Sequence, residues 1–125
     1  MRIVLVLGIL VGAAGCADPC GNTILESLES PDGKRVAVLF SRDCGATTSM
    51  STQLSILAAG ERLKGSGTTF IADDDHGKAP SNRLGVIPVM MNWISSRELA
   101  VSYPSNARVF LKKEKGNGTA ITYNR

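Results

Sequence analysis

The sequence is poor in the side chains that most often build catalytic sites. Its 125 residues include one histidine, one tryptophan and three cysteines, and aromatic residues make up 5% of the total. It has no Gly-x-Ser-x-Gly segment and no evident pairing of a base with an orienting residue, so it lacks the pattern of a serine hydrolase. Its N-terminal apolar run, residues 3–11, is far shorter than the roughly 20 residues of a permanent membrane-spanning helix.

Strong charge of either sign is also missing. The formal net charge is +3, and the basic residues are scattered along the chain. The one basic run, Lys112 to Lys115, is interrupted by Glu114 and is typical of a solvated strand end; a phosphate or anionic-lipid patch is the alternative. This balance gives no basis for nucleic-acid binding, and no cofactor is expected.

The N-terminus has the three-part layout of a secretory signal peptide over residues 1–15. Arg2 precedes the apolar run, and small residues follow it up to Gly15. The segment Ala13-Ala14-Gly15-Cys16 resembles the lipobox of bacterial lipoproteins. The resemblance implies cleavage after Gly15 and a diacylglyceryl thioether on Cys16. A buried core strand is the alternative, which the extreme N-terminal position of the run disfavours.

The same resemblance implies acylation of the new amino group, for example by palmitate, and several acyl chains hold a protein stably on a membrane. Ala17 follows the lipidated cysteine, at the place where aspartate retains lipoproteins at the inner membrane of enteric bacteria. We therefore expect a lipid-anchored protein of the bacterial cell envelope, on the outer membrane and facing the periplasm. The membrane is then its first partner.

Cys20 and Cys44 remain as an even pair in an oxidising compartment, which favours a disulfide between them. That bond would close a loop of about 25 residues and stabilise the domain by about 3.5 kcal/mol in the chain-entropy model. In the alternative, Cys44 is a nucleophile that works with the lone His76. No third residue that would orient such a pair stands out, so the disulfide is the favoured interpretation.

Apolar residues after Cys20 recur with a period of two, and no segment carries a sustained helical stripe. Ser30-Pro31-Asp32-Gly33-Lys34 predicts a turn, because Pro31 presets φ and Gly33 accepts a positive φ; residues 24–42 are therefore a hairpin. Pro88 cannot donate to a strand ladder, so residues 86–93 lie at an edge or a bulge. Among the predicted core residues are Leu54, Ile56, Trp93, Tyr103 and Phe110.

The pattern predicts an all-β fold, a small antiparallel meander closed as a sandwich or a barrel. After the signal peptide we expect a lipidated tether over residues 16–23 and a single β domain over residues 24–125. The domain has seven or eight short strands, at 24–29, 35–42, 53–57, 68–72, 86–93, 99–103, 108–112 and 119–123.

Two motifs resemble a family of small bacterial lipoproteins of unknown function. They are the Ser-Pro-Asp-Gly-Lys turn at residues 30–34 and the Cys-Gly-Ala-Thr-Thr segment at residues 44–48. The resemblance is specific at the second motif and loose elsewhere between Cys20 and Tyr123. It implies a common fold unit and a common disulfide, and it implies no activity.

The densest polar cluster is Asp73-Asp74-Asp75-His76, in a predicted loop over residues 73–83. Carboxylates with one imidazole are a candidate cation site. However, the carboxylates are adjacent rather than alternating, and an EF-hand loop that began at Asp73 would have Leu84 at its twelfth position. We therefore expect a solvated candidate binding loop and no metal. The hydroxyl row at residues 47–52 is a second candidate surface, although such rows more often satisfy backbone groups.

Three functions follow as hypotheses. The first is a non-enzymatic envelope module that binds a protein or another envelope component, with no catalytic residues. The second is an inhibitor of a host hydrolase such as lysozyme, by analogy with other small lipid-anchored β domains. The third is a hydrolase that uses His76 with the neighbouring aspartates, which requires His76 to line a concave pocket.

Overall fold

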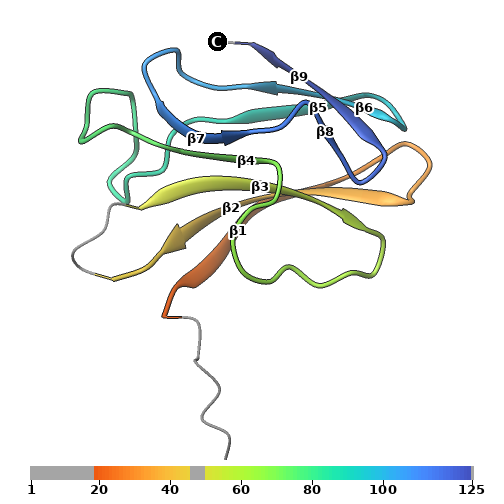
Figure 1. Cartoon of the computed structure of the whole chain (residues 1–125), viewed down its shortest axis with the longest axis horizontal. Coiled ribbons are helices and arrows are strands. Elements are labelled where there is room, and N and C mark those ends of the chain that lie inside the picture. The colour runs from red at the N-terminus through yellow and green to blue at the C-terminus, as the bar shows by residue number, and fades with distance from the viewer. Residues whose placement is uncertain (1–18, 46–49, 125) are drawn as a thin grey trace, which may run out of the picture.

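The computed structural model describes residues 19–45 and 50–124. This part of the chain is a two-layer β-sandwich, which confirms the all-β prediction (Figure 1). The larger sheet has five strands in the order β1-β2-β3-β4-β7, and the smaller has four in the order β5-β6-β9-β8. The strands are β1 (Gly21–Glu29), β2 (Arg35–Asp43), β3 (Ser51–Ala58), β4 (Phe70–Asp73), β5 (Met90–Ser95), β6 (Glu98–Ser102), β7 (Arg108–Lys112), β8 (Lys115–Gly116) and β9 (Thr119–Asn124).

Within these residues the chain forms no helix, and so none that is long and apolar enough to cross a bilayer. The strands differ most from the predicted ranges at three places, and the other boundaries differ by two residues or fewer. β1 begins at Gly21, inside the predicted tether, because its first residues pair with the end of β2. β5 begins at Met90 rather than Val86, since Pro88 cannot donate to a ladder. β8 is a ninth, two-residue strand, between the predicted strands at 108–112 and 119–123.

The chain follows a meander only through β4. Strands β1 to β4 each pair antiparallel with their neighbour in sequence. The chain then crosses to the smaller sheet for β5 and β6 and returns to pair β7 with β4. It crosses again to place β9 beside β6, in the one parallel pair among the described strands. These crossings put sequence-distant strands side by side, which a simple meander would not do.

The core lies between the sheets and follows the period-two pattern of the sequence. Leu54 and Phe70 from the larger sheet and Leu99 from the smaller are completely buried. Tyr103 and Tyr123 pack around Phe70, with ring centroids 5.1 and 5.9 Å from its own. Burial raises the pKa of Tyr123 to about 12. The predicted core residues Leu54, Ile56 and Tyr103 are thus confirmed.

The two other aromatic residues that were expected in the core behave differently. Trp93 is half-buried and packs against the core, and its indole N–H donates to the Leu28 carbonyl (2.8 Å). Phe110 is 59% exposed, so its predicted burial is wrong. The pairing of β4 with β7 is irregular at this residue, and the Arg108 guanidinium lies 5.0 Å from its ring centroid. The irregularity interrupts the alternation on which the prediction depended.

The outer face of the larger sheet is covered by its own connection, residues 59–69. Val38 and Phe40 of β2 are buried there with Leu57 of β3, and Leu63 of the connection packs against them. Polar contacts hold the connection in place: Gly67 N–H donates to Gln53 Oε1 (2.6 Å) and Thr68 N–H donates to Ser55 Oγ (3.0 Å). The central strands of this sheet are therefore buried on both faces, and the smaller sheet keeps the open face.

Candidate functional site

The acidic cluster at residues 73–76 is built into the fold by a partner from another strand. Asp73, at the end of β4, is only 3% exposed. Arg108, opposite it in β7, donates to its two carboxylate oxygens at 3.1 and 2.6 Å, and Asp75 N–H donates a third bond at 2.9 Å. Burial raises the pKa of Asp73, but these hydrogen bonds outweigh it and hold the pKa below the ordinary value of 3.8.

The rest of the loop is engaged in a similar way. Ser81 Oγ donates to Asp74 (2.9 Å), and the Lys78 ammonium lies 3.8 Å from an Asp75 oxygen. His76 is exposed on a turn with φ +58°, and its side chain has no hydrogen bond to any described residue. Nowhere in residues 19–45 and 50–124 do three or more His, Cys, Asp or Glu side chains gather in a way that could hold a metal ion. The acidic side chains therefore stabilise the loop rather than converge on an open centre.

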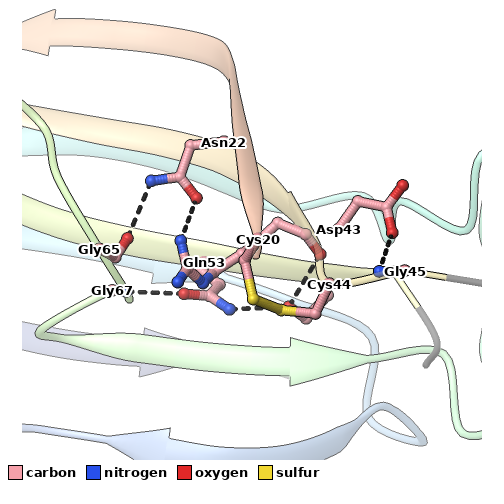
Figure 2. The surroundings of a disulfide bond; sticks show 10 residues. Cys20, Asn22, Asp43, Cys44, Gly45, Gln53, Gly65 and Gly67 are labelled. Atoms are coloured by element: carbon pink, nitrogen blue, oxygen red, sulfur yellow. Dashed lines mark hydrogen bonds between the residues drawn. A yellow bond between two sulfur atoms is a disulfide. The ribbon is translucent and has the colours of Figure 1, made fainter. Parts of the chain in front are cut away.

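Cys20 and Cys44 form a disulfide, as predicted (Figure 2). The bond joins the residue before β1 to the residue after β2, directly beyond the Gly21–Asp43 pair. It therefore fixes the first hairpin at its open end, opposite the turn at residues 30–34. Cys44 is consumed in this bond, so the alternative in which it is a free nucleophile is wrong.

Beside the disulfide, the side chain of Asn22 lies between β2 and the 59–69 connection (Figure 2). Its amide donates to the Gly65 carbonyl (2.8 Å), and its oxygen accepts from Arg42 (2.8 Å). Arg42 is 8% exposed, so this is a largely buried charge. These bonds attach the edge strand β1 and the 59–69 connection to β2, so the Asn22 side chain stabilises the fold.

Other predicted positions are outside the described residues or serve the fold. Cys16 and the signal peptide fall outside them, as do residues 47–49 of the hydroxyl row. Of the hydroxyls that are described, Ser51 Oγ accepts from the Gln53 amide (2.7 Å) and Thr52 Oγ1 accepts from Ile87 N–H (3.2 Å). The described end of the row thus satisfies polar groups of the fold.

The outer face of the smaller sheet is an open surface with few charged residues. The register places β6 between β5 and β9, so that Asn92, Ala100 and Thr122 form one row across the sheet, and Met90, Ser102 and Asn124 form the next. We call the part of this face formed by β5, β6 and β9 the neutral face, because Glu98 is the only charged residue at its outward positions; Lys115 of β8, opposite Ala120, lies at its margin. We define it by nine outward-facing residues, which are Met90, Asn92, Ile94, Glu98, Ala100, Ser102, Ala120, Thr122 and Asn124.

The neutral face combines exposed apolar side chains with a shallow groove. Met90 and Ile94 of β5 are 72% and 57% exposed, which is unusual for large apolar residues. Small side chains on β6, Ala100 and Ser102, leave a hollow of about 150 Å³ between β5 and Asn124 of β9. This volume is below the 300–1,000 Å³ typical of small-molecule sites and suits a single protein side chain.

A second hollow adjoins the neutral face at Ala120. It measures about 530 Å³ and is lined by Arg97, Lys115 and the turn that joins β8 to β9. Arg35 of β2 stabilises this turn, because its Nε donates to the Asn117 carbonyl (2.5 Å). The neutral face therefore has a basic rim at this end of the sheet.

The sequence contained part of the signal for this surface. The inward positions predicted for residues 86–93 and 99–103 imply that Met90, Asn92 and Ala100 point outward. The parallel pairing of β6 with β9 has no local signal, because nothing near residues 98–102 specifies residues 120–124 as their neighbours. Comparison of the chain with protein-family models, with characterised proteins and with solved structures finds no match.

Proposed function

We propose that this protein is a non-enzymatic binding module of the bacterial cell envelope, anchored by lipid at Cys16, which binds a protein partner through the neutral face. The observation that carries the proposal is the composition of that face. Eight of its nine outward positions are uncharged, in a chain of which 20% is charged, and two of them hold exposed Met and Ile side chains. Protein interfaces show this combination of charge depletion at the centre, enrichment in methionine and a charged rim.

The shape of the face also supports a protein ligand. Backbone ladders hold the three strands in place, and most side chains on the face are short, so little conformational entropy is lost when a partner covers it. Met90 and Ile94 can insert into a partner, while the groove over Ala100 can receive one of its side chains. A catalytic role has less support, because His76 is exposed on a turn and has no hydrogen-bonded neighbour in the described chain.

The anchor is tested separately from the binding face. We expect the full chain, expressed in bacteria with an alkyne analogue of palmitate, to carry the label in the membrane fraction. Cys16→Ser should lose the label and remain as the uncleaved precursor, whereas Cys20→Ser should keep the label. A chain that is never labelled, or is labelled equally after Cys16→Ser, would show that the anchor is assigned wrongly.

The binding face is tested by photo-crosslinking in cells. A photoreactive residue at Thr122 should yield a discrete adduct with an envelope protein, identified by mass spectrometry. The matched control is the same residue at Arg62, which is exposed on the connection that covers the other sheet. Met90→Asp should abolish the Thr122 adduct, because it buries an unpaired charge in the interface. Equal adducts at both sites, or none at Thr122, would contradict the proposal.

The inhibitor hypothesis predicts a different result from the same protein. Micromolar protein should then slow lysozyme, and the residues that matter should lie on an exposed loop such as residues 73–83 rather than on the neutral face. Inhibition that survives Met90→Asp but is lost on Lys78→Ala would favour the inhibitor over the envelope module.

A further inference from the structure

Each sheet of the sandwich ends in two edge strands, and β5 differs from the other three. The edges are β1 and β7 in the larger sheet and β5 and β8 in the smaller. β1 contains Glu26 and Glu29, β7 contains Arg108 and Lys112, and β8 is two residues long and contains Lys115. Short length and charge are the usual devices that keep an edge from pairing with another chain. β5, with the sequence Met-Met-Asn-Trp-Ile-Ser, has six residues and no charge.

The outward side chains of β5 are also self-complementary. Met90 and Ile94 lie two residues on either side of Asn92, and all three are exposed. If two copies of β5 pair antiparallel about Asn92, each Met90 faces an Ile94 of the other copy, and the two Asn92 side chains face each other. Directly opposed residues have Cβ atoms about 4.5–5.5 Å apart, so the apolar pairs can pack and the two amides can hydrogen-bond.

The other edges do not offer this arrangement. The same operation on β7, about Phe110, would place Arg108 opposite Lys112, which is a pair of like charges. A β1 pair would bring together two strands that each carry two glutamates. We infer that this protein forms a two-fold symmetric homodimer by antiparallel pairing of β5 with β5, which joins the two smaller sheets into one continuous eight-stranded sheet.

The bulge of β5 is compatible with this pairing. The register of β5 on β6 is regular from Met90 to Trp93 and shifts only between Trp93 and Ser95. The pairs nearest the dimer axis, Asn92 with Asn92 and Met91 with Trp93, therefore fall on the regular part of the strand, and only Ile94, which faces Met90, lies at the bulge. Pairing through the edge also leaves the rest of the neutral face open, so that the faces of the two copies become adjacent. The dimer does not depend on the partner proposed above.

Cysteine crosslinking in cells tests the pairing on the full chain. Asn92→Cys would place two thiols opposite each other across the dimer axis, within reach of a disulfide. The matched control is Thr122→Cys, on the same row of the same face, whose symmetry mate would be about 24 Å away at the usual strand spacing. We expect most of the Asn92→Cys chain to run as a reducible dimer, and the Thr122→Cys and unmodified chains to run as monomers.

Charge pairs give a second, independent test. Two full chains with different affinity tags are produced together, and one is used to purify the other. Copurification should fall about tenfold when both carry Asn92→Lys or both carry Asn92→Asp, and should return when one carries each substitution. Thr122→Lys in both copies should have no effect. A dimer band for Asn92→Cys no stronger than for Thr122→Cys, or copurification that ignores the charges at residue 92, would overturn the inference.

Discussion

Two buried threonines in this fold differ in their hydrogen bonding. The same substitution, Thr→Val, should therefore change the free energy of unfolding in opposite directions at the two sites. Thr119 is 2% exposed and Thr52 is completely buried, and both lie in strands. Thr119 Oγ1 has no hydrogen-bond partner among the described residues, whereas Thr52 Oγ1 accepts a bond from Ile87 N–H (3.2 Å). Valine has nearly the same shape and is β-branched like threonine, so Thr→Val changes mainly the hydroxyl at each site.

The magnitudes follow from what each hydroxyl does. A buried hydroxyl without a partner costs roughly 1–3 kcal/mol, so Thr119→Val should raise the free energy of unfolding by about 1 kcal/mol after partial relaxation. Thr52→Val removes a hydrogen bond and leaves the Ile87 N–H buried without its acceptor. It should lower the free energy of unfolding by about 1–3 kcal/mol. The two variants should therefore lie on opposite sides of the unsubstituted protein.

The assay is urea unfolding of the full chain in a mild non-ionic detergent, followed by the fluorescence of Trp93. This residue is the only tryptophan and is half-buried against the core, so its emission reports on the folded packing. The midpoint should rise for Thr119→Val and fall for Thr52→Val, with unchanged slopes. If Thr119→Val lowers the midpoint as much as Thr52→Val does, the hydroxyl of Thr119 has a stabilising partner and the argument is refuted.

Two further predictions use the same unfolding assay. Cys44→Ser should lower the free energy of unfolding by about 3.5 kcal/mol, because it opens a loop of about 25 residues. Treatment of the unsubstituted protein with a reductant should reproduce the loss. An unchanged midpoint would contradict a stabilising disulfide. The ion pair of Asp73 with Arg108 should stabilise the fold in a pH-dependent way. Since the pKa of Asp73 is held below 3.8 in the folded state, its contribution is fully present above about pH 4 and is lost as the pH falls through the folded pKa. Asp73→Asn should therefore be less stable than the unsubstituted protein at pH 7, and the difference should shrink as the pH falls through the folded pKa of Asp73; a difference that stays constant from pH 7 into the acid range would mean that the charge is not its cause.

The features that the sequence predicted are those that depend on neighbours along the chain. Alternation identified Leu54, Ile56 and Tyr103 as inward-facing, because the direction of a side chain in a strand is set by the local backbone. Turn chemistry placed the turn at residues 30–34, where Ser30 Oγ donates to Asp32 (2.7 Å) and Gly33 has a φ of +69°. The disulfide followed from counting cysteines, because the resemblance to a lipobox assigns Cys16 to lipid and leaves Cys20 and Cys44 as a pair.

The features that were missed depend on partners far along the chain. The acidic cluster has the appearance of a solvated loop in the sequence. However, Asp73 is buried and forms an ion pair with the partly exposed Arg108, which lies 35 residues away along the chain. Phe110 was assigned to the core from its strand, but an irregularity in the pairing with β4 turns its ring outward. In both cases a non-local pairing decides the role of a residue whose own sequence context is unremarkable.

The neutral face, which we propose as the binding surface, shows why such a surface can be harder to predict than a core. Each of its strands, taken alone, has the ordinary alternation of a half-exposed strand, with small or polar residues at the outward positions. Scarcity of charge on two or three such positions means little by itself. It becomes informative only when the pairing of β6 with β5 and β9 gathers nine positions into one surface that carries a single charge. A core can be predicted residue by residue, because burial favours the same residue types everywhere. An interface depends on which outward residues lie next to one another, and strand order decides this.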